Sequence, residues 1–276
     1  MEQLTYFKSI ILGLIQGLTE FLPVSSSAHI MLAEEIFGLK LESGLAGAFT
    51  VMLHLGTLVA VVAWYFKRII KMLAHPVKGE IKYLILATIP TVLFVLALKY
   101  TGWDDVIDSV ARTLLPYAFL FTALILLLAD GIGRARSIAK ASHGRVRAKD
   151  ALIMGLMQCV GTFTGVSRSG STIAGGLAGG LKRKSAADFS FMMSIPAILG
   201  AAVLELRHVL KNGALQTALS SQLPQMLAGV LAAFVAGLAA IGLMLRVVKK
   251  SRLKWFSLYL TLLAALLIIN TYVHWW

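Results

Sequence analysis

Apolar runs with few charges follow one another along the whole chain. Eight of them are present, at residues 7–22, 45–66, 83–98, 113–129, 151–167, 189–205, 225–245 and 255–273. A straight membrane-spanning helix needs about 20 apolar residues at 1.5 Å each. Three of the runs reach that length, and three more can be completed by uncharged flanks or by Lys and Arg side chains that extend to the membrane surface. Six spanning helices are therefore predicted, and the runs at 7–22 and 151–167 remain.

These two remaining runs belong to a peptide that occurs twice, and each copy ends in a break rich in hydroxyl side chains. The copies are Gly13–Ser27 and Gly155–Ser169, 142 residues apart. The identical pairs are Gly13/Gly155, Leu14/Leu156, Gln16/Gln158, Phe21/Phe163, Val24/Val166, Ser25/Ser167 and Ser27/Ser169. An amphipathic stretch follows each break, at 28–37 and at 170–181. We interpret each copy as a re-entrant helix–loop–helix element, which enters and leaves the membrane on the same side.

The order of these elements predicts the fold. Each half of the chain contains one re-entrant element and three spans, and because three is odd the second half must be inverted relative to the first. We therefore expect an all-α polytopic membrane protein, an inverted-topology repeat with six transmembrane helices and two re-entrant helix–loop–helix elements. Residues 1–276 would form a single membrane domain, with repeats at about 1–130 and 150–276 joined by a basic cytoplasmic loop, 130–150.

Composition and charge agree with a membrane protein. Hydrophobic residues make up 58% of the chain and charged residues 14%, against roughly 25% charged in soluble domains. Of the 26 Lys and Arg residues, 19 fall on the side of the membrane reached after the first span and 6 on the side of the N-terminus, with Arg168 left in the repeated motif. Basic residues collect in cytoplasmic loops, so both termini should face outward. This asymmetry explains the net charge of +13 without a nucleic-acid partner, and none is expected.

Several side chains that could bind a ligand or take part in catalysis lie close together in sequence at the first break. They are Gln16, Glu20, Ser25, Ser26, Ser27 and His29. Gln16 and Glu20 are spaced i, i+4 and share one helix face, and Pro23 then favours the end of that helix. An ionisable carboxyl at membrane depth needs a partner or a water-filled cavity, so Glu20 is a candidate functional residue. The serines fit either a functional role or the capping of a helix.

The second break supplies a cation, Arg168, within Gly165-Val-Ser-Arg-Ser-Gly-Ser-Thr172. If the halves are inverted, the two breaks meet near the membrane midplane and Arg168 lies near Glu20. Helix N-termini bind phosphate through free N–H groups and partial positive charge, and the planar guanidinium matches phosphate oxygens. Hydroxyls surround it, on Ser167, Ser169 and Thr172. Phosphate binding is the favoured interpretation, and a structural ion pair between Arg168 and Glu20 is the alternative.

Together these two motifs closely resemble those of the undecaprenyl-pyrophosphate phosphatase family, the bacitracin-resistance type of bacterial membranes. The matching segments are Gln16-Gly-Leu-Thr-Glu20 with Phe21-Leu-Pro-Val-Ser-Ser26 and His29, then Thr164–Thr172 and Phe189–Pro196. Thr164 stands where the family has proline, so the second break should rely on Gly165. Gln16 occupies the first acidic position of the motif, which leaves Glu20 as its one carboxylate.

The resemblance implies an integral-membrane enzyme that hydrolyses undecaprenyl diphosphate to undecaprenyl phosphate and inorganic phosphate. That reaction recycles the lipid carrier for cell-wall synthesis and confers bacitracin resistance. The protein would lie in the bacterial cytoplasmic membrane, with a pocket that opens outward, and a divalent cation, Mg²⁺ or Ca²⁺, would bind near Glu20. The expected catalytic residues are Glu20, Ser26, His29 and Arg168. The expected substrate-binding residues are Gln16, Ser25, Ser27, Ser167, Ser169 and Thr172.

The nucleophile and the reaction class have alternatives. We expect Ser26 to attack, with His29 or Glu20 as its base; attack by His29 itself or by an activated water stays open, as does the oligomeric state. The main rival function is a polyprenyl-phosphate transporter or flippase, because inverted repeats with broken helices are typical of secondary transporters. An intramembrane serine hydrolase and a non-catalytic structural protein are weaker alternatives.

Overall fold

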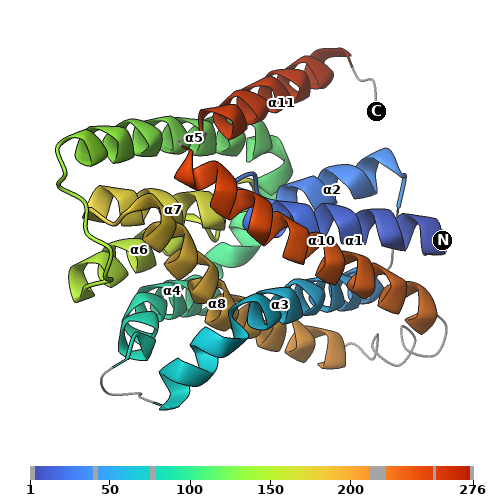
Figure 1. Ribbon diagram of the computed structural model, residues 1–276. Coiled ribbons are helices and arrows are strands. Elements are labelled where there is room, and N and C mark those ends of the chain that lie inside the picture. Colours follow the sequence, from blue (N-terminus) through green and yellow to red (C-terminus); the bar gives the residue numbers. More distant parts are fainter. Residues whose placement is uncertain (1–3, 40–42, 75–78, 212–221, 251–252, 274–276) are drawn as a thin grey trace. The chain divides into compact units, whose positions relative to one another are not determined.

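The computed structural model describes residues 4–39, 43–74, 79–211, 222–250 and 253–273, which form ten helices (Figure 1). Their bounds are α1 Tyr6–Phe21, α2 Ser26–Ile36, α3 Ser43–Ala74, α4 Ile81–Thr101, α5 Trp103–Ile138, α6 Ala148–Val160, α7 Arg168–Gly179, α8 Arg183–Lys211, α10 Leu223–Lys249 and α11 Lys254–Val273. Within these ranges the protein is all-α, as predicted.

The six predicted spans are confirmed as helices that are long and apolar enough to cross a membrane. They are α3, α4, α5, α8, α10 and α11. The repeated peptides instead form pairs of short helices, α1 with α2 and α6 with α7, whose lengths are 16, 11, 13 and 12 residues. Each of the four is shorter than the roughly 20 residues that a span requires.

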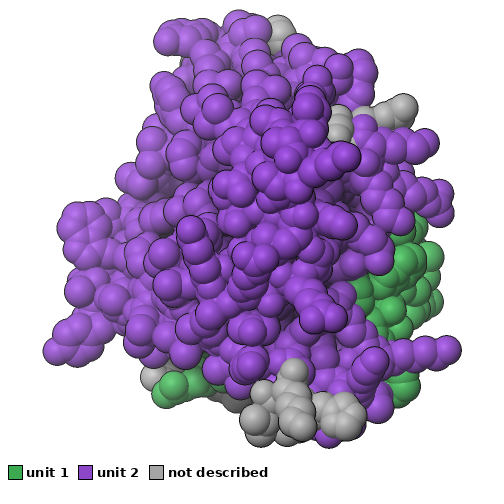
Figure 2. Space-filling model, turned by 60° about the vertical axis from the view of Figure 1, so that its left-hand side comes forward, with its two compact units in different colours: residues 1–21, 26–66, 194–242 green, residues 22–25, 67–193, 243–276 purple. Residues whose placement is uncertain are grey.

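The chain divides into two compact units (Figure 2). Unit 1 consists of residues 1–21, 26–66 and 194–242, and unit 2 consists of residues 22–25, 67–193 and 243–276. Unit 1 therefore contains α1, α2 and most of α3 and α10, while unit 2 contains α4, α5, α6, α7 and α11. The short segment 22–25, which forms the first break, belongs to unit 2 although the helices on both sides of it belong to unit 1.

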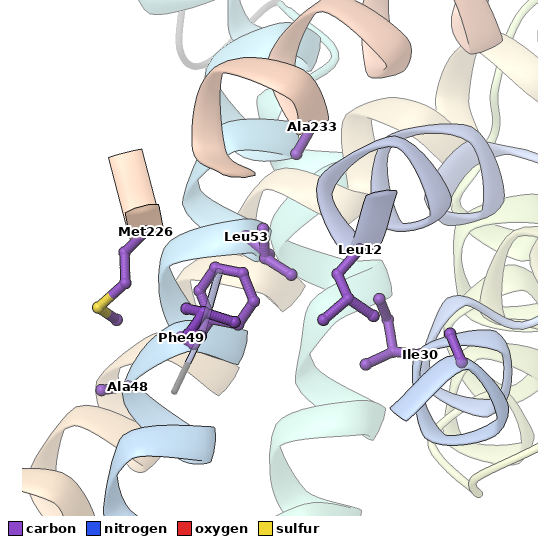
Figure 3. Close-up of a cluster of buried hydrophobic side chains, with 9 residues drawn as sticks. Leu12, Ile30, Ala48, Phe49, Leu53, Met226 and Ala233 are labelled. Carbon is purple, nitrogen blue, oxygen red and sulfur yellow. The ribbon is translucent and has the colours of Figure 1, made fainter. Parts of the chain in front are cut away.

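In unit 1, α1 packs closely against α10. A Cβ atom on Gly17 would lie 2.5 Å from the backbone oxygen of Ala233, and one on Gly13 would overlap the backbone oxygen of Gly229. Small residues allow membrane helices this close approach. A cluster of buried apolar side chains from α1, α2, α3 and α10 completes the packing (Figure 3). It includes Leu12, Ile30, Phe49, Leu53, Met226 and Ala233.

In unit 2, α6 packs against α4 in a similar way. A Cβ on Gly155, the repeat counterpart of Gly13, would overlap the backbone oxygen of Ala87. Three residues on, the Gln158 amide donates a hydrogen bond of 3.0 Å to the Thr91 hydroxyl. The repeated Gly-x-x-Gln sequence therefore lies at a helix contact in both copies, with the Gln side chain buried each time.

The basic connection between the halves is shorter than predicted. Helix α5 continues to Ile138, so the connection to α6 covers 139–147 rather than 130–150. The extra turns are held by α8, because the Arg183 guanidinium donates to a carboxylate oxygen of Asp130 at 2.7 Å and to its backbone oxygen at 2.8 Å. His143 in the connection pairs with the segment between α7 and α8 through hydrogen bonds with Gly180 and Lys182.

Candidate functional site

The first break reverses the chain within four residues. Helix α1 ends at Phe21 and α2 begins at Ser26. The turn contains a hydrogen bond from the Val24 nitrogen to the Leu22 oxygen, and Ser25 adopts φ = +72°. Positive φ is uncommon for a residue other than glycine and costs about 1–3 kcal/mol. This strained turn brings the start of α2 back onto the end of α1.

The Glu20 carboxylate is the centre of the site in unit 1. Its Oε2 accepts a hydrogen bond of 2.6 Å from Ser26 Oγ and one of 3.0 Å from Gln16 Nε2. The Nε2 atom of His54, on α3, lies 3.9 Å from the same oxygen. Glu20 is only 7% exposed. The predicted convergence of Gln16, Glu20 and Ser26 is confirmed by these two hydrogen bonds.

His54 belongs to α3 and lies outside both repeated motifs, yet its side chain is part of this site. Its Nδ1 atom lies 2.8 Å from the backbone oxygen of Thr50, one turn earlier on α3. Because that oxygen can only accept, Nδ1 carries the proton and Nε2 faces Glu20. The sequence signal was a polar side chain within an apolar span, which marks a candidate but does not say which helix the side chain faces.

The remaining predicted residues of the first break lie in and directly after the turn. Ser25 is buried in the turn, Ser27 is exposed on the first turn of α2, and His29 is half-buried one turn into that helix. Their predicted roles in binding and catalysis stay predictions.

The second break depends on Gly165, as expected from the threonine at 164. Helix α6 ends at Val160 and α7 begins at Arg168. Gly165 has φ = +91°, and a Cβ there would lie 2.6 Å from Cβ of Ala118. A glycine therefore supplies both the left-handed backbone and the close approach to α5 that this turn requires.

The serines of the second break build the turn that leads into α7. Ser167 is the N-cap, and its Oγ accepts a hydrogen bond of 3.1 Å from the Gly170 nitrogen, as expected for capping serines. Ser169 Oγ donates a hydrogen bond of 2.9 Å to the backbone oxygen of Leu22 in the first break. A Cβ on Gly170 would lie 3.2 Å from Cβ of Pro23. Segment 22–25 thus lies against the first turn of α7 within unit 2.

Thr172 and Arg168 complete this turn. The Thr172 hydroxyl donates to the Arg168 backbone oxygen at 2.8 Å and lies 2.6 Å from the hydroxyl of Ser190 on α8. It therefore joins α7 to α8, and a phosphate contact would have to replace one of these bonds. Arg168 is the first residue of α7 and is half-buried. Its pairing with Glu20 stays a prediction, since the two residues belong to different units.

The donors for the expected cation are few. Among the residues described, no group of three or more His, Cys, Asp and Glu side chains could hold a metal ion. At the first break, the Glu20 carboxylate is accompanied by Oε1 of the buried Gln16, which has no hydrogen-bond partner in the described part of the chain. Oxygen donors of this kind suit Mg²⁺ or Ca²⁺. They fit a cation only if substrate phosphate and water supply the other ligands.

Comparison with known proteins covers both breaks. Residues 9–266 match the family described as "Bacitracin resistance protein BacA". The chain is 39% identical to the undecaprenyl-diphosphatase of Carboxydothermus hydrogenoformans over 266 residues, which is 95% of this chain and 96% of that protein. It is 35% identical to undecaprenyl-diphosphatase 4 of Bacillus thuringiensis (strain Al Hakam) over 98% of this chain and 99% of that protein. The undecaprenyl-diphosphatase of Methanosphaera stadtmanae is 33% identical over 98% of this chain and 99% of that protein.

Proposed function

The chain belongs to the bacitracin resistance protein BacA family, and on this premise we propose that it is an undecaprenyl-diphosphatase. It removes the terminal phosphate of undecaprenyl diphosphate, a membrane lipid, and releases undecaprenyl phosphate and inorganic phosphate. The recycled carrier lipid then returns to cell-wall synthesis. The observation that carries the proposed site is the hydrogen bond of 2.6 Å from Ser26 Oγ to Glu20 Oε2, which pairs a nucleophile with a base.

The proposed reaction has two steps at one phosphorus atom. Ser26 Oγ attacks the terminal phosphorus while Glu20 takes its proton, and the bond to the bridging oxygen breaks. Glu20 gives that proton to the leaving undecaprenyl phosphate. Water then attacks the phosphoserine, Glu20 takes a proton from the water and returns it to Ser26 Oγ, and inorganic phosphate leaves. Of the two bases considered for Ser26, Glu20 has the required hydrogen bond.

Arg168 and the start of α7 are proposed to hold the diphosphate. The guanidinium and the free backbone N–H groups of the first helical turn are donors for phosphate oxygens. Ser167 and Ser169 support this by fixing the turn from which Arg168 projects, through the capping bond and the bond to Leu22. Charge that develops on the transferring phosphoryl group would be stabilised by these donors. Gln16, Ser25, Ser27 and Thr172 are retained as further candidates for the substrate-binding surface, and His29 as a further candidate catalytic residue.

A divalent cation, Mg²⁺ or Ca²⁺, would be held by the Glu20 carboxylate and the Gln16 amide oxygen. When bound, it would neutralise charge on the diphosphate and polarise its oxygens. Ser26, Glu20 and Arg168 carry the remaining steps.

The proposed topology is the inverted repeat, with two re-entrant elements and both termini outside. The repeated glycines support it. In chain order α10 is the counterpart of α4, and Gly13 of the first copy packs on α10 while Gly155 of the second packs on α4. Each copy thus packs on the fourth helix of the other half, as a two-fold relation between the halves requires. The 19 to 6 distribution of basic residues supports a cytoplasmic location for the connection before α6.

Phosphate release from undecaprenyl diphosphate by the purified protein in detergent tests the function. With Mg²⁺ or Ca²⁺ present, we expect release by the natural sequence and its loss in Glu20→Gln, Ser26→Ala and Arg168→Ala. Ser9→Ala is the matched control, because it removes a buried α1 hydroxyl that has no partner in the described residues. Vectorial lipid transport without phosphate release, from a folded protein, would replace the phosphatase with the transporter alternative.

A further inference from the structure

We propose that His54 is a positioning residue, which keeps the Glu20 carboxylate directed at Ser26 throughout the reaction. The inference rests on the proposed function, since it concerns the base of that reaction. It adds a residue of α3 to the group around Glu20, whose other members, Gln16 and Ser26, come from α1 and α2.

Glu20 lies where a carboxylate benefits from polar neighbours. It is the next-to-last residue of α1, where unpaired carbonyl groups and the negative end of the helix dipole disfavour a carboxylate. Gln16 and Ser26 contact it from within the same short element. His54 approaches the same carboxylate oxygen from α3, with Nε2 at 3.9 Å.

His54 is itself held in place, which a positioning role requires. Its Nδ1 is bonded to the Thr50 oxygen at 2.8 Å, and its own backbone oxygen accepts a hydrogen bond of 2.8 Å from the Thr57 hydroxyl. The helix around it packs tightly on α10, since a Cβ on Gly56 would lie 2.7 Å from the Val230 backbone oxygen. The bond from Nδ1 to Thr50 therefore orients the imidazole ring with Nε2 toward Glu20.

The imidazole combines a hydrogen-bond donor and an acceptor. Because Nδ1 is bonded to the Thr50 oxygen, Nε2 is the ring nitrogen that faces the Glu20 carboxylate, at 3.9 Å. A hydrogen bond of ordinary length forms if the two groups approach by about 1 Å. An amide also combines a donor and an acceptor, whereas an aliphatic side chain has neither. Glutamine should therefore replace His54 in part, and alanine or leucine should not.

Steady-state kinetics of phosphate release separate this role from general damage. For His54→Ala we expect kcat to fall about 10-fold, the equivalent of one hydrogen bond, with KM within about twofold because His54 acts on the base and not on the diphosphate. His54→Gln should recover kcat to within about threefold of the natural value. The control is Leu55→Ala, a neighbouring exposed residue of α3, which should change neither constant.

His54→Leu preserves side-chain volume and repeats the test if the alanine variant does not fold. An unchanged kcat in folded His54→Ala or His54→Leu overturns the inference, as does a His54→Gln variant no better than alanine. If Ser26→Ala and Glu20→Gln lose activity while the His54 variants stay normal, only the inference fails. If Ser26→Ala and Glu20→Gln remain active, the proposed site itself fails.

Discussion

Gly165 offers a test of how the second break is built, because alanine there adds one carbon to a tightly packed turn. The left-handed backbone, at φ = +91°, costs an alanine about 1–2 kcal/mol. The new Cβ would lie 2.6 Å from Cβ of Ala118 and 2.9 Å from Cδ1 of the buried Leu115, and overpacking of this kind costs about 1–3 kcal/mol. Together these terms predict that Gly165→Ala destabilises the protein by about 2–5 kcal/mol.

Activity should fall as well, because Gly165 precedes the α7 N-cap by two residues and Arg168 by three. Relief of the overlap would displace this segment, and a misplacement of about 1 Å can lower a rate about 100-fold. At about 2–4 °C per kcal/mol, the thermal midpoint should drop by about 4–20 °C.

The assays are thermal unfolding of the purified protein in detergent and phosphate release from undecaprenyl diphosphate. Gly131→Ala is the matched control: Gly131 lies in α5, and a Cβ there would have no atom within 4 Å. Alanine at that helical position should be neutral or stabilise by up to about 1 kcal/mol. If Gly165→Ala unfolds and turns over like Gly131→Ala, the second break does not depend on this glycine and the reasoning is refuted.

Other substitutions test the packing, the charges and the buried amide. Gly13→Ala should destabilise by about 1–3 kcal/mol, since its Cβ would overlap the Gly229 backbone oxygen; a thermal midpoint equal to that of Gly131→Ala would contradict the close contact of α1 with α10. Asp130→Ala should destabilise the protein by about 3–5 kcal/mol, because it leaves the largely buried Arg183 charge unpaired. The double variant Asp130→Ala/Arg183→Met should recover part of that loss in the same unfolding assay. Gln158→Leu should lower the thermal midpoint less than Gly13→Ala does. It removes one hydrogen bond to Thr91, but it also removes a buried amide oxygen that has no partner in the described residues. A larger drop would show that the amide is needed.

Hydrophobic patterning was sufficient for the helices. Each of the six apolar runs assigned as spans forms a helix of spanning length, because an apolar segment that crosses a bilayer must satisfy its backbone hydrogen bonds internally. The end of α5 was missed. Its last turns are rich in arginine and resemble a loop, and they are held as helix by Arg183, 53 residues beyond Asp130. A local sequence pattern cannot predict a contact between residues so far apart in the chain.

At the site, too, some contacts were predictable from local sequence and others depend on how distant helices pack. The contact of Gln16 with Glu20 follows from their spacing, and the return of Ser26 follows from the break at Pro23, so both were predictable. The approach of His54 depends on how α3 packs, which the sequence does not show. Thr172 was expected to bind phosphate, but its hydroxyl is hydrogen-bonded within the protein and lies against Ser190. A hydroxyl in a sequence motif does not show which way it points.

Identification of the phosphorylated residue is the most direct test of the proposed chemistry. Undecaprenyl diphosphate labelled in its terminal phosphate would be mixed with the enzyme, the reaction stopped within one turnover, and the labelled peptide identified by mass spectrometry. We predict that the label is found on Ser26, that Glu20→Gln slows its appearance, and that Ser26→Ala neither acquires label nor releases phosphate. Label on His29, or phosphate release by Ser26→Ala, would contradict attack by the Ser26 hydroxyl.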